Sequence, residues 1–278
     1  MRWTRCLCTV GQVVHTLLDG EPVLGIASLA GEIYVLRDKE RDQVEVYDVI
    51  TYRLQRCLTV SDAGELADMT SCEHCRCLYF ANFSECVHRL DLHGAATKWA
   101  VSGRPCALSV NAEHNLLATC LEVRKIKEFS SHGDLLRELT LPDDVVNPWH
   151  AIELTSGQFI VCHGGRDDPV NRVCVISADG RRIVHSHGGQ RGSYTGQYRG
   201  PVHLAVDNNE FVFVADLSNW RVTLLSPTLQ YVRQVVSSDK LKGLFWWQLY
   251  LDVQRRRLYV ADIDWLMSRS GRVVVFSV

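Results

Sequence analysis

Three side chains that can bind a metal ion, Asp68, His150 and His203, occupy equivalent places near the start of separate apolar, strand-like patterns. Leu24, Ala107 and Gln248 take the same place in three further patterns, and a proline lies two residues earlier in four of the six. Imidazole nitrogens and a carboxylate oxygen suit Zn²⁺, and a carboxylate also suits Ca²⁺. If these strands converge on one axis, the three residues form a candidate metal site. The alternative is that they are polar side chains hydrogen-bonded within the fold.

Other motifs for metal binding or catalysis are weaker. Cys72-Glu-His-Cys-Arg-Cys77 has the spacing C-x2-C-x-C, but no second cysteine pair follows at the separation usual for a zinc site. The sequence contains no Gly-x-Ser-x-Gly motif that would present a serine nucleophile. No catalytic residue is therefore assigned.

Arginine and aromatic residues occur together in the segments that connect the predicted strands. The candidates for a binding face are Arg37, Arg104, Trp149, Arg166, Tyr198, Arg199, Trp220, Trp246 and Trp247. Arginine beside tryptophan or tyrosine can stack single-stranded bases and hold phosphates, and the same residue types dominate protein interfaces. Acidic residues in the same segments, among them Glu122, Asp167 and Asp168, reduce the positive potential. Both kinds of partner remain open.

The overall composition limits the classes of partner. Lys and Arg number 30 against 32 Asp and Glu, so the net charge of −2 gives no global basic field, and DNA is not expected as a partner. No uninterrupted run of roughly 18 apolar residues is present, so no membrane span is expected. Many of the 11 cysteines lie in apolar strand patterns, which favours reduced thiols and a cytoplasmic location.

The elements that would position these residues follow from an internal repeat. An apolar tetrad that favours a β-strand recurs six times, at intervals of about 40–50 residues, the spacing of propeller blades. The tetrads begin at Ile33, Leu78, Leu116, Phe159, Val212 and Leu258. Each tetrad is preceded by one strand pattern and followed by another, and turn signals in most units lead to a fourth. The sequence therefore predicts an all-β fold of six four-stranded antiparallel sheets.

The two ends of the chain complement each other. The sixth unit stops at Val278 after its third strand, whereas residues 13–18 form a strand pattern that precedes the first unit. Pairing of this strand with the last blade would close the ring and remove an exposed sheet edge. We therefore expect residues 1–278 to form a single domain.

The fifth unit resembles a known repeat. Gly196-Gln-Tyr-Arg-Gly-Pro-Val-His-Leu-Ala-Val-Asp207, Phe211-Val-Phe-Val-Ala-Asp216 and Asn219-Trp-Arg-Val222 are similar to a repeat of the NHL family. The resemblance implies a six-bladed β-propeller, as in the C-terminal domains of tripartite-motif ubiquitin ligases. Trp220 stands where that family has its name-giving histidine, and no ligase segment precedes the repeats, so ligase activity is not implied. Asp216 and Arg221 are expected to form an ion pair across their turn.

These observations predict a non-enzymatic binding scaffold that recognises partners through its loop face. A protein partner is expected first. Some NHL propellers bind single-stranded or stem-loop RNA on this face, so the resemblance makes RNA the second expectation. The alternative is a metal-dependent lyase or hydrolase, because some six-bladed propeller enzymes hold an ion in the central channel; otherwise no cofactor is expected.

Overall fold

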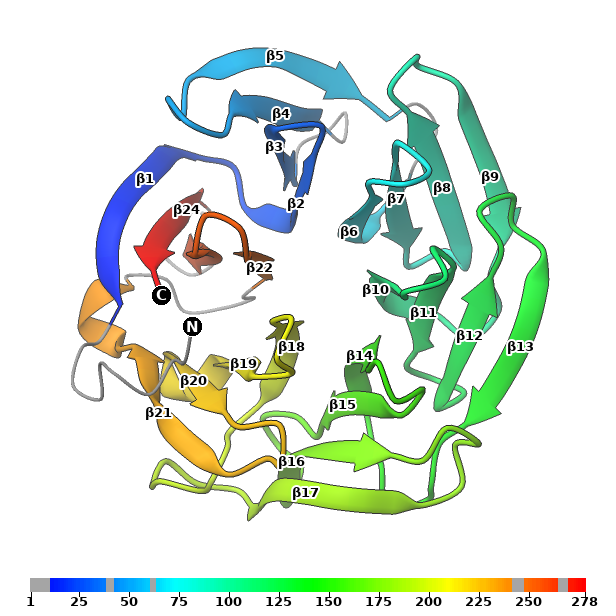
Figure 1. The fold of residues 1–278 in the computed structure, drawn as a ribbon, viewed down its shortest axis with the longest axis vertical. Helices are drawn as coiled ribbons and strands as arrows, with labels where there is room; N and C mark the ends of the chain where they lie inside the picture. Colours follow the sequence, from blue (N-terminus) through cyan, green and yellow to red (C-terminus); the bar gives the residue numbers. More distant parts are fainter. Residues whose placement is uncertain (1–10, 39–42, 61–63, 242–247, 265–269) are drawn as a thin grey trace.

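The chain forms a ring of six four-stranded antiparallel sheets around a central channel (Figure 1). The computed structural model describes residues 11–38, 43–60, 64–241, 248–264 and 270–278. The strands of each sheet are called a to d from the channel outward. This architecture confirms the predicted all-β, six-bladed propeller.

The first three blades follow one another in the sequence. Blade 1 contains β2 (Val23–Leu29), β3 (Glu32–Arg37), β4 (Gln43–Asp48) and β5 (Leu54–Thr59). Blade 2 contains β6 (Leu66–Cys72), β7 (Cys77–Asn82), β8 (Cys86–Asp91) and β9 (Ala96–Ala100). Blade 3 contains β10 (Pro105–Val110), β11 (Leu116–Cys120), β12 (Lys125–Phe129) and β13 (Leu135–Thr140).

The last three blades complete the ring. Blade 4 contains β14 (Pro148–Glu153), β15 (Phe159–His163), β16 (Val170–Ile176) and β17 (Ile183–Gln190). Blade 5 contains β18 (Pro201–Val206), β19 (Val212–Asp216), β20 (Arg221–Leu225) and β21 (Tyr231–Val236). Blade 6 contains β22 (Leu249–Asp252), β23 (Arg257–Asp264) and β24 (Ser270–Ser277), and its outer strand is β1 (Gln12–Gly20).

The blades are held together by apolar cores that lie between them. Each of six buried clusters draws its residues from two neighbouring blades. The cluster between blades 5 and 6, for example, contains Phe213 and Phe276, each fully buried. Full burial of such a side chain contributes about 1.5–3 kcal/mol. The b strands β7, β11, β15 and β19 are buried along their whole length because another blade covers each face. In the described part of the chain no helix is both long and apolar enough to cross a membrane.

The first strand closes the ring, as predicted. β1 pairs antiparallel with β24, and Gln12 lies opposite Ser277. Two of its valines, Val13 and Val14, are exposed, whereas Leu17 is 1% exposed and belongs to the core between blades 6 and 1. Leu17 is therefore the side chain that ties the described part of the closing strand to a core.

We expect Leu17→Ala to lower the free energy of unfolding by about 2–5 kcal/mol, because it removes a buried side chain and leaves a cavity at the closure. Val13→Ala on the same strand is the matched control, with an expected change within about 0.5 kcal/mol. Chemical denaturation of both variants measures the difference. Equal effects of the two substitutions would contradict closure through Leu17.

Candidate functional site

The innermost strand of five blades carries a β-bulge near its start. The register shifts there between Val23 and Gly25, Leu66 and Asp68, Pro105 and Ala107, Pro148 and His150, and Pro201 and His203. The pairing confirms that Asp68, Ala107, His150 and His203 are equivalent. In blade 1 the prediction was wrong by one residue, because Gly25, not Leu24, occupies this position opposite Leu36. A Cβ at Gly25 would lie 2.6 Å from the Cβ of Met69, so blade 2 packs directly against its backbone.

The three polar residues at the bulge connect one blade to the next. Each side chain accepts a hydrogen bond from a buried backbone N–H in strand a of the following blade. The contacts are Asp68 Oδ2 with Leu108 N (2.7 Å), His150 Nδ1 with Leu204 N (3.1 Å) and His203 Nδ1 with Leu249 N (3.3 Å). We call these three contacts the inter-blade clasps. They agree with the expectation of polar channel side chains hydrogen-bonded within the fold.

The inter-blade clasps leave the histidines poorly suited to hold a metal ion. Because Nδ1 of each ring accepts an amide proton, the neutral imidazole carries its own proton on Nε2 and has no free lone pair there. The rings of His150 and His203 lie 4.0 Å apart between centroids, and both are buried. Within the described residues, no group of three His, Cys, Asp or Glu side chains could hold a metal ion, and this applies to Asp68, His150 and His203.

Burial controls the protonation of the clasp residues. It lowers the pKa of His150 to about 4 and holds the pKa of His203 well below its usual value. The same loss of solvation raises the pKa of Asp68 to about 8. All three side chains therefore favour their uncharged forms, which suits hydrogen bonding in an interior, and a protonated Asp68 offers no negative charge to a cation.

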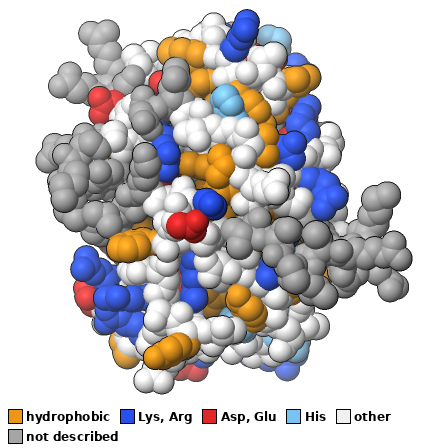
Figure 2. Space-filling view, turned by 90° about the vertical axis from the view of Figure 1, so that its left-hand side faces the viewer, with side chains coloured by type: hydrophobic (Ala, Val, Ile, Leu, Met, Phe, Trp, Pro, Cys, Tyr) orange, Lys and Arg blue, Asp and Glu red, His pale blue; other side chains and the backbone are white. Residues whose placement is uncertain are grey.

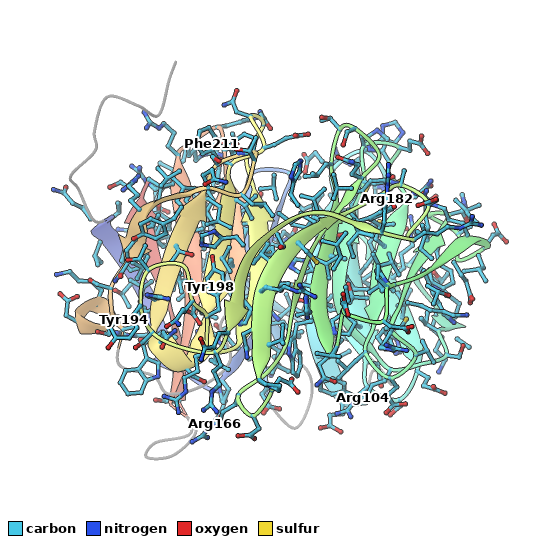
Figure 3. All side chains as sticks on the ribbon, turned by 90° about the horizontal axis from the view of Figure 1, so that it is seen from below. Arg104, Arg166, Arg182, Tyr194, Tyr198 and Phe211 are labelled. Atoms are coloured by element: carbon cyan, nitrogen blue, oxygen red, sulfur yellow. The ribbon has the colours of Figure 1, made fainter. Side chains whose placement is uncertain are left out.

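The predicted binding face is built by the loops between strands b and c and between strands d and a. It is the lower face in Figure 3, where Arg104, Arg166 and Tyr194 project, while Arg182 and Phe211 lie at the opposite face. We call it the b–c face. Of the residues predicted for this face, some are buried, some lie at the surface, and two lie outside the described residues.

Two of the predicted face residues are buried, so the expectation that they are exposed was wrong. The Arg37 side chain is 1% exposed; its Nε lies 2.7 Å from Glu45, and its Nη1 donates to the carbonyls of Glu21 and Gly271. Arg37 thus joins blade 1 to blade 6. Tyr198 is 1% exposed, packs in the core between blades 4 and 5, and places its hydroxyl 3.2 Å from a threonine hydroxyl.

Other predicted residues remain at the surface to different degrees. Trp149 is half-buried, and its Nε1 donates to the carbonyl of Gly164. Trp220 is 42% exposed and adopts a left-handed backbone conformation with φ +49°. Arg166 is exposed and Arg199 is half-buried. Trp246 and Trp247 lie outside the described residues.

Most arginines of the b–c face are paired with carboxylates. Arg221 lies 2.9 Å from Asp216, which confirms the predicted ion pair, and Arg272 repeats this arrangement with Asp262 in blade 6. At the surface, Arg104 lies 3.9 Å from Glu122 and Arg124 lies 3.3 Å from Asp143. On the side of the ring shown in Figure 2, Lys and Arg side chains also lie at separate places among hydrophobic and uncharged surface. Positive charge is therefore local.

A small pocket on the b–c face has cationic walls. It has a volume of about 270 Å³ and is lined by Arg191, Gly192, Ser193 and Arg199. Neither arginine forms an ion pair with any residue that the structure describes. Tyr194, directly after this lining, is 80% exposed. Arg191 is not among the face residues predicted from the sequence. Its Gly-rich surroundings give no indication that the loop turns back on itself beside Arg199.

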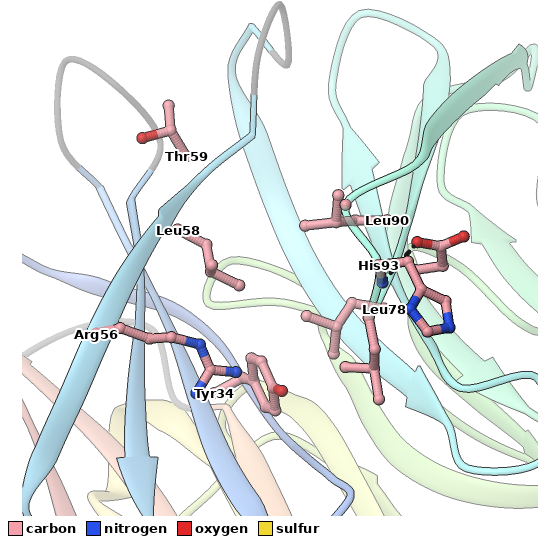
Figure 4. A pocket seen from close by; sticks show the side chains of 10 residues that line it. Tyr34, Arg56, Leu58, Thr59, Leu78, Leu90 and His93 are labelled. Carbon is pink, nitrogen blue, oxygen red and sulfur yellow. Dashed lines mark hydrogen bonds between the residues drawn. The ribbon is translucent and has the colours of Figure 1, made fainter.

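A second cavity lies between blades 1 and 2, away from the b–c face. It has a volume of about 340 Å³, and its walls include Leu58, Leu78 and Leu90, with Arg56 and His93 at the edge (Figure 4). Arg56 is already paired with Glu32. Its lining also includes Tyr34, Thr59 and Asp91, so this cavity mixes apolar, acidic and basic side chains and has no pair of arginines without ion-pair partners.

Comparisons with known proteins support the fold alone. No family model matches the chain, and no curated protein matches it. Among solved structures, a streptogramin B lyase is similar with a TM-score of 0.62 and 10% identity, over 94% of this chain and 98% of that one. The β-propeller domain of Cps50 (Swd1) from Myceliophteria thermophila has a TM-score of 0.62 and 11% identity, over 96% and 99%. A Bacteroides caccae protein of unknown function has a TM-score of 0.59 and 14% identity, over 81% and 85%.

The inter-blade clasps predict a pH dependence of stability. In the unfolded chain His150 binds a proton below pH 6.5, whereas in the folded chain it does so only near pH 4. Acid therefore favours unfolding: the contribution of His150 is complete above pH 6.5, and about 3 kcal/mol of it is lost as the pH falls to 4. His150→Asn keeps an acceptor near the position of Nδ1 but cannot titrate. We expect the free energy of unfolding of this variant, minus that of the wild type, to rise by the same amount as the pH falls over this range.

Urea denaturation between pH 7 and pH 4 measures this difference, and His132→Asn, at an exposed histidine, is the control. If the free energies of unfolding of the wild type and His150→Asn change with pH in parallel, the clasp does not hold a neutral imidazole.

Proposed function

We propose that this chain is a non-enzymatic binding scaffold, a single NHL-like propeller domain whose b–c face recognises a protein partner. The NHL assignment rests on the sequence of blade 5 and on the Asp216–Arg221 pair that fixes its b–c turn. The cysteines of the described residues are all free thiols, which supports a reducing compartment, and we propose the cytoplasm.

One observation carries the proposal: exposed aromatic rings and unpaired arginines occur together on the b–c face. Tyr194 is 80% exposed and Trp220 is 42% exposed. Arg191 and Arg199 have no ion-pair partner among the described residues. Tryptophan, tyrosine and arginine are the residues that contribute most binding energy in protein interfaces. Large aromatic side chains left in water on a rigid disc are therefore best explained as contact residues.

The loops that carry these residues are joined to each other. Asn219 donates from Nδ2 to the carbonyl of Gly192 at 2.9 Å, and Arg221 donates from Nη1 to the carbonyl of Ser193 at 2.9 Å. Trp220 lies between these two donors in the sequence. The b–c turn of blade 5 and the loop before it therefore form one continuous, ordered surface, which reduces the entropy lost on binding.

A channel enzyme is less well supported. The side chains that would bind an ion there, Asp68, His150 and His203, already accept backbone hydrogen bonds. The lyase among the similar solved structures shares only 10% identity and supports no transfer of activity. A stoichiometric ion in the purified protein that is absent from the His150→Ala/His203→Ala double variant would reverse this judgement.

RNA is the second candidate, because the same arginines and aromatic rings could hold phosphates and stack bases. The ion pairs of Arg104 and Arg124 with carboxylates count against a continuous cationic track. An RNA partner would bind with a strong salt dependence and would be lost on nuclease treatment.

We expect the Tyr194→Ala/Trp220→Ala double variant to lose at least about tenfold in affinity for the partner, because truncation of a contact residue of this kind costs about 2 kcal/mol or more. Immobilised wild type and variant are compared for proteins retained from an extract with and without nuclease treatment, and affinity is then measured with the purified partner. Ile50→Ala, at a 76% exposed residue on the opposite face, is the matched control. Undiminished binding by the double variant would contradict the proposal, and binding that disappears with nuclease would favour RNA.

A further inference from the structure

The arginine pocket lined by Arg191, Gly192, Ser193 and Arg199 concentrates positive charge without a matching carboxylate. Its two arginines contrast with Arg104 and Arg221, which lie within 3.9 Å and 2.9 Å of acidic groups. The Nε atom of Arg199 is buried and has no hydrogen-bond partner among the described residues. The buried donor is unfavourable, and an anion in the pocket would compensate the positive charge of the same guanidinium group.

The pocket is preorganised by hydrogen bonds that do not involve its own guanidinium groups. Arg221 donates to the carbonyls of Ser193 and Gln197 at 2.9 and 2.6 Å, and this holds both sides of the loop. The backbone N–H of Arg199 donates to Asp216 Oδ1 at 2.8 Å. The backbone of Arg191 pairs with that of Tyr198 in an isolated bridge. The two arginine side chains are therefore presented from a fixed frame.

The size and surroundings of the pocket favour one anionic group over a polyanion. A volume of about 270 Å³ accommodates one carboxylate or phosphate group with its neighbouring atoms. Asp167 and Asp168 lie on the b–c loop of blade 4, and the exposed Arg124 of blade 3 is already paired with Asp143. A nucleic-acid strand carries a negative charge at every nucleotide, so its phosphates would be repelled by these carboxylates. A peptide with a single acidic side chain would avoid this repulsion.

We propose that the arginine pocket binds one oxyanion, a carboxylate or a phosphate, on an acidic peptide segment of the protein partner, and that Tyr194 contacts an apolar residue beside it. The guanidinium forks of Arg191 and Arg199 provide the planar, charge-assisted donors that such oxyanions require. The inference rests on the proposed protein-binding function and specifies the chemistry of the partner.

The test follows the Nε–H resonance of Arg199 by NMR, assigned through its loss in Arg199→Lys. The probes are inorganic phosphate and three five-residue peptides with blocked ends that differ only in a central phosphoserine, glutamate or serine, followed by leucine. We expect phosphate and the two charged peptides to shift this resonance in a saturable way, and the serine peptide to leave it unmoved. The difference between the phosphoserine and glutamate arms identifies which oxyanion the pocket prefers.

Arg191→Gln should weaken binding of the charged peptide at least about tenfold, the loss of one charge-assisted hydrogen-bonded contact. Arg191→Lys keeps the charge without the fork and should give an intermediate loss. Arg182→Gln, at an exposed arginine of the opposite face, is the matched control and should have little effect.

An unmoved Arg199 resonance, or an equal effect of Arg182→Gln and Arg191→Gln, would overturn the inference and indicate only diffuse attraction. Preferential binding of a single-stranded RNA over the peptides would overturn it in favour of nucleic acid. If a protein partner still depends on Tyr194 and Trp220 but not on the two arginines, the pocket inference fails while the proposed function stands.

Discussion

The ring depends on how the unpaired edge of each innermost strand is satisfied. Strand a has strand b on one side and the channel on the other, so part of its backbone has no strand partner, and each buried N–H left without an acceptor costs about 1–3 kcal/mol. Side chains of neighbouring blades make the missing contacts: Asp68, His150 and His203 accept from the N–H groups of Leu108, Leu204 and Leu249, and the hydroxyls of Ser71 and Ser109 donate to the carbonyls of Ser28 and Ala151. The polar residues of the channel are thus part of the mechanism that joins blade to blade.

Because of this constraint, the channel residues that stabilise the fold differ from the surface residues that are available for binding. Histidines that would attract attention as ligands or catalysts hold neighbouring blades together, and their burial disfavours a positive charge. The b–c face has a different character, because its loops carry Tyr194 and Trp220 in contact with water. Their exposure is not required by the packing of the blades, which the apolar clusters between blades already provide. The fold does not require these two aromatic rings at the surface, and that is why the functional proposal is placed on the b–c face.

The sequence predicted the features that repeat and missed those that depend on contacts between distant segments. Apolar tetrads and turn signals identified the blades, and the strand at residues 13–18 identified the closure, because both follow local periodicity. The connection between strands a and b is one residue shorter in blade 1, where four residues separate the paired Ser28 and Ile33, than in blade 5, where five separate Val206 and Val212, so the equivalent position moved from Leu24 to Gly25. Arg37 was expected on the surface, but its acceptors include the carbonyl of Gly271 in blade 6, a contact that no local pattern encodes. The arginine pocket likewise depends on how Arg221 fixes a loop 28 residues earlier.

The distribution of charge decides what kind of recognition such a face can support. Ion pairs such as Arg104 with Glu122 reduce the long-range potential, so attraction at a distance is weak and screened by salt. Selectivity must then come from short-range geometry, in which a fixed guanidinium pair and a nearby ring meet matching groups at defined positions. A rigid frame makes this possible, because the loop that carries Arg191 is hydrogen-bonded to the b–c turn of blade 5, and blade 5 is packed between its neighbours. The same apolar cores that stabilise the ring thereby also determine the precision of the binding face.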